Sequence, residues 1–352
     1  MRKLEIYIHI GLPKTATTFL QNLIYPQLVD SKLAYNPPWI IELLDKYFNY
    51  DVEIDHNKFN HRLETEIDSG IQKLLLSEEG YSVDGYSFLY LDKLHKLKRL
   101  FPNAKILLML RYQPDWLLAM YKQSVYQMNP QSIGSFLQFN RIKREFINNE
   151  TFLTRNLYEG AKKLPKMNIS SIDYLKFVKD YRNQFGKQNV KILFFEDLRN
   201  KNQSFYNEIQ TFIGSDQVIV DKPKLYVSLS AFAIVTLTMV YKLANLLGIS
   251  IRYSHNRSLQ NKPRKGYLLF LHNVINKLNH QLTWVGFRQL FKLNFPIKIN
   301  PDLLARNNMR NILNVVFREH NKKLKSYLSE LQVPLIYTGK ATHTTSDSYH
   351  TK

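Results

Sequence analysis

The first twenty residues constrain the fold of this chain most strongly. Ile6–Ile10 form an apolar run typical of a buried strand, a short turn carrying Lys14 follows, and a helical pattern begins at Thr17. The first turn of a helix has unpaired N–H groups at the positive end of its dipole, so an anion bound there gains several donors. Lys14 adds a full charge, and Thr17 and Thr18 add hydroxyl donors. The sequence therefore predicts a strand–loop–helix anion site.

Three further apolar runs have the length and composition of buried strands. They are Leu74–Leu76, Lys105–Leu110 and Val190–Phe195. Helical patterns lie between the strands, at Thr17–Leu28, Asp115–Gln127 and Asp173–Phe185. Strands that alternate with helices indicate a parallel sheet covered on both faces. We therefore expect an α/β fold with a P-loop-like parallel sheet flanked by helices.

The chain becomes mainly helical after Leu198. Helical patterns cover Gln203–Ile213 and a long stretch from about Asp302 to Leu331, and a polar segment at 252–266 predicts an exposed loop between them. The last twelve residues have the composition of a disordered tail. The expected organisation is a core at 1–217, a basic and mainly helical extension at 218–338 on the acceptor side, and a tail at 339–352.

The positive charge is concentrated in one segment. The chain has a net charge of +20, and the segment from Lys222 to Lys325 contains 18 Lys or Arg residues against Asp302 and Glu319. This pattern suits a solvated basic surface, an acidic acceptor such as a glycan, or peripheral contact with an anionic membrane. No nucleic-acid recognition module is present in the sequence, so nucleic acid is not an expected partner.

Several features predict a cytoplasmic protein, with the inner face of the membrane as a second possible location. The first predicted strand follows Met1 so closely that no signal peptide fits before it. The uncharged run Leu225–Tyr241 is short for a membrane span and predicts a buried helix. The chain has no cysteine, which excludes disulfides and Cys-ligated metal sites.

The spacing around Lys14 differs from that of nucleotide triphosphatases, which need Gly-x-x-x-x-Gly-Lys-Ser/Thr. Here Lys14 follows Gly11 by three residues and is preceded by Pro13. The string Gly-Leu-Pro-Lys-Thr-Ala-Thr-Thr at 11–18 instead resembles the 5′-phosphosulfate loop of sulfotransferases that use 3′-phosphoadenosine-5′-phosphosulfate (PAPS). The resemblance implies that Lys14 contacts the leaving oxygen. It implies that the cofactor is also held by Pro13, Thr15, Ala16, Thr17 and Thr18.

A second element agrees with this resemblance. The run Ile106–Leu110 ends on Arg111 and is followed by Tyr-Gln-Pro-Asp-Trp, which is similar to the 3′-phosphate element of the same family, especially its bacterial carbohydrate-acting branch. The resemblance implies that Arg111 binds the 3′-phosphate. Looser similarity at 174–214 and at Phe317–Leu324 extends it over most of residues 5–217 and the late helix.

Two positions depart from the family pattern. Ala16 replaces a common glycine, and because alanine disfavours positive φ we expect this turn to be near helical geometry or slightly reshaped, with binding retained. Ala119 replaces the serine that binds the 3′-phosphate, a loss of roughly 1.5–3 kcal/mol. Ser124 lies about 140° around the helix and is a poor substitute. The string Arg264-Lys265-Gly266, similar to a 3′-phosphate string of some cytosolic members, would compensate.

The acceptor hydroxyl needs a general base, and the run Leu74–Leu76 ends in Ser77-Glu78-Glu79. This resembles the Ser-x-Glu of bacterial members and points to Glu79, while Glu78 stays open because neighbouring strand residues face opposite ways. Two such acids also occur as ordinary surface residues. His9 is a third candidate, although a histidine among apolar strand residues is usually structural. Sulfuryl transfer requires no metal, and no ligand spacing indicates one.

The predicted function is transfer of a sulfuryl group from PAPS to a hydroxyl of a carbohydrate, as in a surface polysaccharide, glycan or glycolipid. One alternative is a catalytically impaired sulfotransferase-like protein that binds glycans or anionic membranes, which Ala119 keeps open. Another is a nucleotide-dependent kinase. The lysine spacing and the lack of a strand ending in a Mg²⁺-binding carboxylate argue against the kinase.

Overall fold

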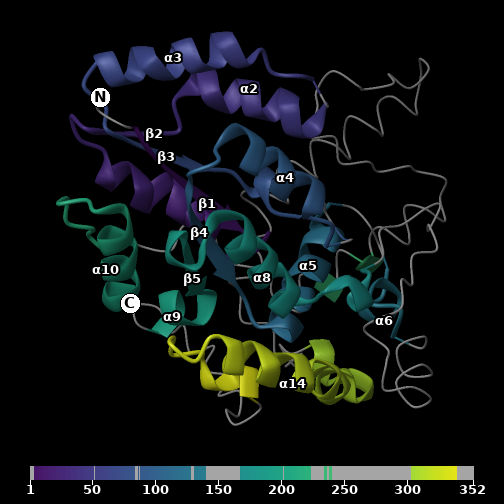
Figure 1. Cartoon of the computed structure of the whole chain (residues 1–352). Coiled ribbons are helices and arrows are strands. Elements are labelled where there is room, and N and C mark those ends of the chain that lie inside the picture. Colours follow the sequence, from purple (N-terminus) through teal and green to yellow (C-terminus); the bar gives the residue numbers. More distant parts are fainter. Residues whose placement is uncertain are drawn as a thin grey trace, which may run out of the picture.

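The computed structural model describes residues 4–50, 52–83, 86, 88–127, 131–139, 167–200, 202–222, 234–235, 238–239 and 303–338. Within these residues, five strands form one parallel sheet in the order β2-β3-β1-β4-β5 (Figure 1). The strands are β1 (Glu5–Gly11), β2 (Leu33–Tyr35), β3 (Lys73–Ser77), β4 (Lys105–Leu110) and β5 (Val190–Phe194). Four predicted strands are confirmed. The three-residue edge strand β2 was not predicted, because it is too short to carry an apolar pattern.

The chain reverses direction across the sheet between β1 and β4. After β1 the chain continues to the edge strand β2, whereas after β4 it continues to β5 at the other edge. In open α/β sheets a crevice forms at the carboxyl ends of two such neighbouring strands. All pairs are parallel, so Gly11, Ser77 and Arg111 lie at this same edge. The fold therefore brings the predicted anion loop and the predicted 3′-phosphate arginine together.

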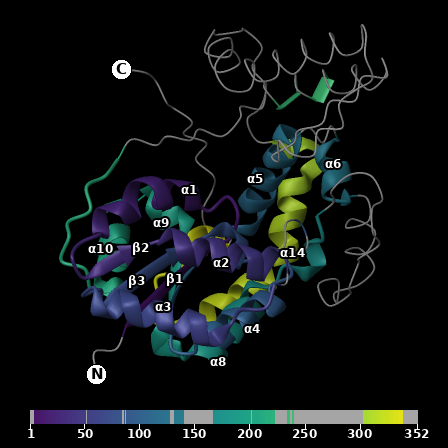
Figure 2. The same ribbon diagram turned by 90° about the horizontal axis from the view of Figure 1, so that it is seen from above.

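Helices cover both faces of the sheet (Figures 1 and 2). The helical segments before β4 are α1 (Thr17–Phe19), η1 (Leu20–Ile24), η2 (Tyr25–Leu28), α2 (Pro38–Asn49), α3 (His56–Asp68), η3 (Glu79–Tyr81) and α4 (Leu91–Leu100). Those after β4 are α5 (Gln113–Tyr126), α6 (Ile133–Phe136), η5 (Ile169–Ser171), α8 (Tyr174–Phe185), η6 (Lys187–Asn189), α9 (Phe195–Asn200), α10 (Asn202–Ile213), η9 (Leu303–Asn308), α14 (Met309–Tyr327) and η10 (Leu335–Thr338). The expected α/β fold, a parallel sheet flanked by helices with a helical C-terminal segment, is therefore confirmed.

The alternation of side chains along each strand separates two buried clusters. Ile8 and Ile10 of β1 pack in one cluster with α2, α4 and α8. Tyr7 of β1 and Met109 of β4 pack in the other, with the helical run 17–28 and α10. Because side chains of a strand alternate between faces, an apolar run without polar interruptions requires cover on both sides. The sheet is accordingly the centre of the core.

The helix that follows the anion loop is continuous but irregular. The predicted helix Thr17–Leu28 consists of one α-helical turn, a π-helical segment at Leu20–Ile24 and a 3-10 segment at Tyr25–Leu28. Pro26 has no N–H to donate, which removes one helical bond from the last turn. The other predicted helices of the core lie within a few residues of their expected bounds. Asp173 caps α8 by accepting from the N–H of Lys176, and Gly186 ends it at φ 90°.

The C-terminal helix α14 is fastened to the helix that follows Arg111. The buried amides of Gln113 and Asn321 exchange two hydrogen bonds, of 2.7 and 3.1 Å. Arg310 pairs with Asp115 at 2.9 Å, and the Tyr112 hydroxyl donates to Asn314 at 2.8 Å. Segments more than two hundred residues apart in the chain therefore support one another.

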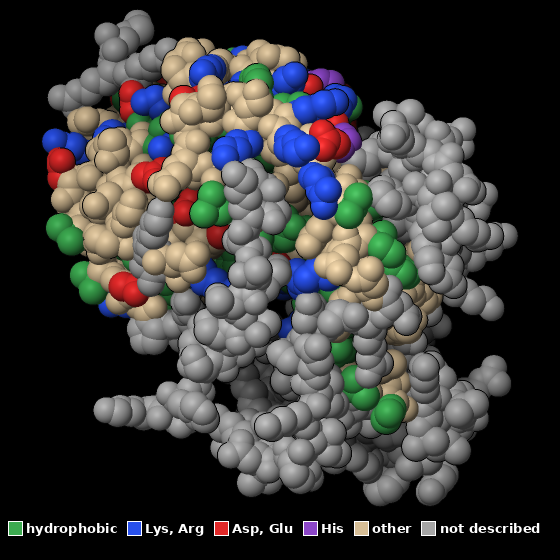
Figure 3. Space-filling model, turned by 90° about the horizontal axis from the view of Figure 1, so that it is seen from below, with side chains coloured by type: hydrophobic (Ala, Val, Ile, Leu, Met, Phe, Trp, Pro, Cys, Tyr) green, Lys and Arg blue, Asp and Glu red, His purple; other side chains and the backbone are tan. Residues whose placement is uncertain are grey.

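Several sequence predictions fall outside the described residues. They concern the helix at 225–241 apart from four of its residues, the loop at 252–266 with Arg264-Lys265-Gly266, and the tail at 341–352. In the part that is described, no helix is both long and apolar enough to cross a membrane. Figure 3 shows one face of the molecule, on which described Lys and Arg side chains are spread with Asp and Glu among them.

The amide pair between α5 and α14 generates a stability prediction. Gln113→Leu leaves the buried Asn321 amide without its partner, which should lower the free energy of unfolding by about 1–3 kcal/mol. The double variant Gln113→Leu/Asn321→Leu removes both polar groups and should cost less than the sum of the single variants. Urea unfolding measures all three, and strictly additive losses would contradict the pairing.

Candidate anion-binding site

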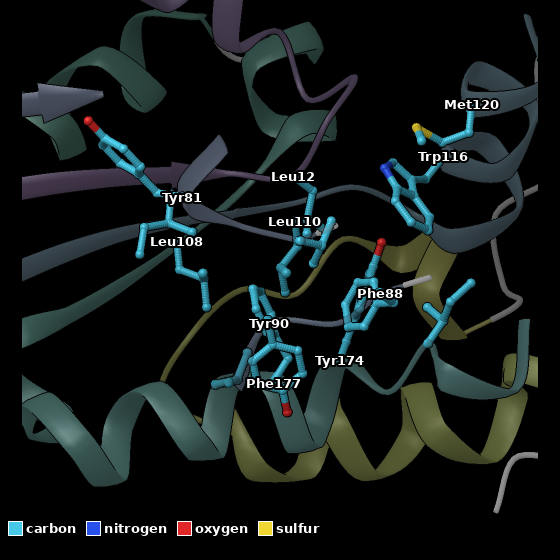
Figure 4. Close-up of a cluster of buried hydrophobic side chains, with 14 of the residues drawn as sticks. Leu12, Tyr81, Phe88, Tyr90, Leu108, Leu110, Trp116, Met120, Tyr174 and Phe177 are labelled. Atoms are coloured by element: carbon cyan, nitrogen blue, oxygen red, sulfur yellow. The ribbon is translucent and has the colours of Figure 1, made fainter. Parts of the chain in front are cut away.

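The loop Gly11–Thr17, called the anion loop below, is fixed by hydrogen bonds to its carbonyl groups. The Leu12 carbonyl accepts from the Thr15 hydroxyl at 2.6 Å and from the Thr15 N–H at 3.2 Å. The Pro13 carbonyl accepts from the indole N–H of Trp116 at 2.7 Å, and the Lys14 carbonyl accepts from the Arg111 guanidinium at 2.7 Å. Trp116 lies in the same buried cluster as Leu12 (Figure 4). The core and β4 thereby hold the loop in one conformation.

The fixed loop presents a series of unpaired N–H groups. Lys14 and Ala16 have left-handed backbone conformations, with φ of 66° and 63°, and Thr15 lies between them at negative φ. Alternation of this kind turns successive N–H groups toward one point and makes an anion-binding nest. Within the described residues, the N–H groups of Lys14, Ala16, Thr17 and Thr18 donate no hydrogen bond. The loop therefore has the backbone geometry of a phosphate or sulfate site.

The expectation for the backbone at Ala16 was wrong. Alanine was expected to avoid positive φ, with the turn either near helical geometry or slightly reshaped, but Ala16 has a left-handed conformation with φ 63° and ψ 23°. A left-handed residue with a Cβ costs roughly 1–2 kcal/mol. The loop retains this conformation because Trp116 and Arg111 hold the carbonyls of the two residues that precede Thr15. Strain of this sort is commonly found at functional sites.

The three threonines differ in what they present to a ligand. Thr18 is exposed, whereas Thr15 and Thr17 are buried. The Thr15 hydroxyl already donates to Leu12, so this side chain shapes the loop. Thr17 lies against Gly11, where an added Cβ would come within 2.4 Å of the Thr17 hydroxyl oxygen. Gly11 is therefore required for close packing, a role that the sequence alone did not indicate.

Two cations flank the loop without a carboxylate partner. Among the described residues, neither Lys14 nor Arg111 forms a salt bridge, and both are partly buried. Burial lowers the pKa of Lys14, an effect that nearby Glu79 partly opposes. The Arg111 guanidinium lies 4.3 Å from the centre of the Phe195 ring, and the Tyr174 hydroxyl donates to the Arg111 carbonyl at 2.8 Å. Because buried charge without a partner is costly, this arrangement favours an anionic ligand.

The two candidate acids at the end of β3 have different surroundings. Glu79 is partly buried, and burial raises its pKa while Lys14 opposes that change, which places the carboxylate in the electrostatic field of Lys14. Glu78 is exposed and acts instead on Tyr35 and Tyr81, whose pKa values are raised mainly by burial and further by Glu78. The structure therefore brings Glu79, and not Glu78, to Lys14 and the anion loop.

A buried polar network lies beneath the loop. Ser77 at the end of β3 bonds to His9 at 2.8 Å, and its carbonyl accepts from Gln21 at 2.9 Å and from Asn36 at 3.0 Å. His9 is fully buried, and burial lowers its pKa to about 3. Its ring is therefore neutral and enclosed, which excludes it as the base that meets an acceptor hydroxyl.

Glu196 is a residue that sequence reasoning missed. It lies at the start of α9, and one carboxylate oxygen accepts from the Tyr112 N–H at 2.9 Å while the other, also buried, has no partner among the described residues. Burial raises the pKa of Glu196 to about 7. Tyr112 follows Arg111 directly, so Glu196 supports the turn that carries the arginine. Only the contact between α9 and that turn, which is tertiary, identifies it.

The position of the missing serine has no hydroxyl replacement nearby on α5. Ala119 is partly exposed, while Ser124 is fully buried in the core and cannot reach a ligand at the loop. In the described part of the chain, no cluster of three His, Cys, Asp or Glu residues could hold a metal ion. The described groups around the anion loop are thus a nest, the two cations Lys14 and Arg111, and the Glu79 carboxylate, with Glu196 behind Arg111.

Comparison with known proteins finds similarity to solved structures only. No model of a protein family matches the chain, and no curated protein matches its sequence. A sulfotransferase from Alicyclobacillus acidocaldarius is 15% identical, with a TM-score of 0.41, over 71% of this chain and 98% of its own. A mouse sulfotransferase complexed with PAP is 13% identical, with a TM-score of 0.33, over 83% of this chain and 89% of its own. A sulfotransferase domain from the curacin biosynthetic pathway is 12% identical, with a TM-score of 0.30, over 95% and 100%. At such levels the likeness assigns neither activity nor substrate to this chain.

The left-handed conformation of Ala16 generates a prediction. Ala16→Gly relieves about 1–2 kcal/mol of backbone strain, offset by about 0.4–1 kcal/mol because glycine is freer when unfolded. We expect the free energy of unfolding to rise by up to about 1.6 kcal/mol. The matched control is Ala119→Gly within α5, which should lower it by about 0.5–1 kcal/mol. Loss of stability in Ala16→Gly would contradict the loop conformation.

Proposed function

We propose that this protein is a PAPS-dependent sulfotransferase that transfers a sulfuryl group to a hydroxyl of a carbohydrate. The observation that carries the proposal is the meeting of Lys14 and Arg111 at the ends of β1 and β4, next to unpaired N–H groups of the anion loop. Two cations without carboxylate partners suit a ligand with two anionic groups. PAPS has such groups in its 5′-phosphosulfate and its 3′-phosphate.

The anion loop and Lys14 are suited to the 5′-phosphosulfate. The convergent N–H groups would bind the 5′-phosphate, helped by the hydroxyls of Thr17 and Thr18. Arg111 would bind the 3′-phosphate with the guanidinium nitrogens that do not hold the Lys14 carbonyl. The Arg111 side chain would therefore have two roles. One N–H group holds the loop that binds the 5′-phosphosulfate, and the other N–H groups bind the 3′-phosphate.

The chemistry assigned to this chain is electrostatic and positional. Glu79 would accept the proton of the acceptor hydroxyl while the oxygen of that hydroxyl attacks sulfur. The bond between sulfur and the bridging oxygen of the 5′-phosphate breaks in the same step. Lys14 would stabilise the charge that builds on that bridging oxygen. Burial raises the pKa of Glu79 and so strengthens it as a base, while Lys14 keeps it from being protonated too readily.

The carbohydrate acceptor rests on the resemblance of the 106–117 element to the bacterial carbohydrate-acting branch. The basic segment from Lys222 to Lys325 supports an acidic acceptor or one held at an anionic membrane, because clustered positive charge raises the encounter rate with either. Most of this segment lies outside the described residues. We propose that the extension at 218–338 faces the acceptor and that the reaction takes place in the cytoplasm.

A second candidate function is binding without catalysis. Ala119 offers no hydroxyl and Ser124 is buried, so the 3′-phosphate would depend on Arg111 among the described residues. A protein with weakened donor affinity could instead bind glycans or anionic membranes through the basic segment. Retention of glycan or liposome binding without any binding of adenosine 3′,5′-bisphosphate (PAP, the product left by PAPS) would select this candidate. Mg²⁺-dependent binding of ATP would select a kinase.

The donor assignment predicts how nucleotide affinity depends on Arg111. At one hundred times its Kd, PAP should stabilise the folded wild-type protein by about 2.7 kcal/mol. This stabilisation should appear as a rise in the melting temperature. Arg111→Met should weaken PAP binding by about tenfold to a hundredfold. Binding of adenosine 5′-phosphate, which lacks the 3′-phosphate, should also weaken, because the bond to the Lys14 carbonyl is lost, but by less than that of PAP. Calorimetry measures both ligands, and the absence of any wild-type binding at millimolar PAP would overturn the proposal.

The base assignment predicts a separation between binding and transfer. Labelled sulfate from PAPS, offered to a panel of acidic and neutral glycans, identifies the acceptor and the rate. Glu79→Gln and Lys14→Ala should each lower that rate by about a hundredfold or more, with Glu79→Gln leaving PAP affinity within a few-fold. Because burial raises the pKa of Glu79, this carboxylate becomes protonated at a higher pH than an ordinary carboxylate does. The transfer rate should therefore begin to fall with decreasing pH while the pH is still above the usual pKa range of carboxyl groups. The matched control is Glu78→Gln, which should keep most of the activity.

A further inference from the structure

His9 has a buried nitrogen whose use the site chemistry does not explain. It lies on β1 two residues before Gly11 and faces the same side of the sheet. Its Nδ1 lies 2.8 Å from the Ser77 hydroxyl, and its Nε2 is buried without a partner among the described residues. A Cβ at Gly11 would come within 3.1 Å of this Nε2 and within 2.4 Å of the Thr17 hydroxyl oxygen. His9 and Thr17 therefore flank the same point, at the base of the anion loop.

The hydrogen bonds of Ser77 determine which nitrogen of His9 carries the proton. The side-chain nitrogen of Gln21 lies 2.9 Å from the Ser77 carbonyl, and a carbonyl only accepts, so the amide must present its NH₂ to Ser77. The same NH₂ lies 3.3 Å from the Ser77 hydroxyl oxygen, which therefore accepts from Gln21. The Ser77 hydrogen is then donated to Nδ1 of His9, the remaining contact of that hydroxyl. With the proton on Nδ1, the Ser77 hydrogen would have no acceptor among these contacts, so the tautomer that satisfies Ser77 carries the proton on Nε2.

An Nε2–H in this place is an unsatisfied donor. A buried donor without an acceptor costs about 1–3 kcal/mol, so a partner is expected in the functional state. The candidate acceptor is the Thr17 hydroxyl oxygen, which flanks the same point at Gly11 and whose present contact is a long one of 3.4 Å to the Thr15 hydroxyl. Thr15 donates its own hydrogen to Leu12, so Thr17 is the donor in that contact. The lone pairs of Thr17 thus remain free for His9.

We propose that His9 is a positioning residue of the anion loop: its Nε2–H donates to the Thr17 hydroxyl oxygen when an anion binds, and so directs the Thr17 hydrogen at that anion. The inference rests on the proposed function only in taking the 5′-phosphosulfate as the anion. A hydroxyl that accepts one hydrogen bond becomes a better donor of another, so the chain from Ser77 through His9 to Thr17 strengthens the contact with the anion. No charge on His9 is required.

The first test is the tautomer of His9 in the free protein. Long-range ¹H–¹⁵N spectra of the histidine-labelled chain report the protonated ring nitrogen, and His9 is identified among the ten histidines by the signals that disappear in His9→Gln. We expect the neutral Nε2–H tautomer throughout pH 6–8, the range about neutrality in which exposed histidines titrate. The Nδ1–H tautomer, or a charged ring, would overturn the proposal. This measurement does not depend on the identity of the anion.

The second test compares two variants that each keep one of the two nitrogen positions. In His9→Gln the side-chain NH₂ takes the place of Nε2, whereas in His9→Asn the amide takes the place of Nδ1 and contacts Ser77 only. We expect the PAP affinity of His9→Gln to be within about threefold of wild type. The affinity of His9→Asn should be about tenfold weaker than wild type, a loss of about 1.4 kcal/mol. The free energies of unfolding of the two variants should be similar.

The two variants also separate a positioning role from a merely structural one. Equal loss of PAP affinity in both, in proportion to their loss of stability, would overturn the proposal. If wild-type protein fails to bind PAP, the proposed function fails, and the tautomer measurement alone decides whether His9 carries the donor assigned to it.

Discussion

The hydrogen bond from the Arg111 guanidinium to the Lys14 carbonyl is the interaction on which the arrangement of the site depends. It joins the end of β4 to the loop that follows β1, across the point where the chain reverses direction in the sheet. Together with the bond from Trp116 to Pro13, it turns the loop carbonyls away from the ligand side. The N–H groups must then face the other way, which is what makes the loop an anion nest. The groups of the candidate site are thus held by the core, through Trp116 of α5 and Arg111 at the end of β4.

The electrostatic balance of the site follows from burial. Lys14 and Arg111 lose part of their hydration without gaining a carboxylate partner among the described residues, and burial lowers the pKa of each. The acids nearby are placed so that they do not cancel these charges. Glu79 faces Lys14 from beyond salt-bridge distance, and Glu196 accepts the Tyr112 N–H behind Arg111. An anionic ligand would therefore supply the negative charge that the described residues do not place against Lys14 and Arg111.

Much of the fold was predictable because its physical signals are local. Apart from Lys105 at the start of its run, the runs at 6–10, 74–76, 105–110 and 190–195 are interrupted only by His9 and Lys191, as strands buried on both faces require. Asp173 and Gly186 mark the two ends of α8 in the sequence itself. The edge strand β2 and the helices α2, α3 and α4 were not predicted. β2 is short, and α3 and α4 are strongly polar, so their packing against β3 and the core stabilises them more than their own pattern does. α2 does carry an amphipathic pattern, with Ile40, Leu44 and Phe48 on its buried face, which the prediction from sequence did not use.

The sequence by itself determined the order of strand, lysine loop and helix, and with it the kind of ligand that the loop suits, because the spacing of Lys14 and the hydroxyls after it are local properties. Only the tertiary structure decided how the loop is held. The left-handed conformation of Ala16, the contact of Trp116 with Pro13, the separation of Glu79 from Glu78, and the enclosure of His9 against Ser77 and Gln21 all depend on residues from other strands and helices. Local sequence favours helical backbone at Ala16, and long-range hydrogen bonds overrule that preference because they fix the carbonyls of Pro13 and Lys14, which lead into the strained turn.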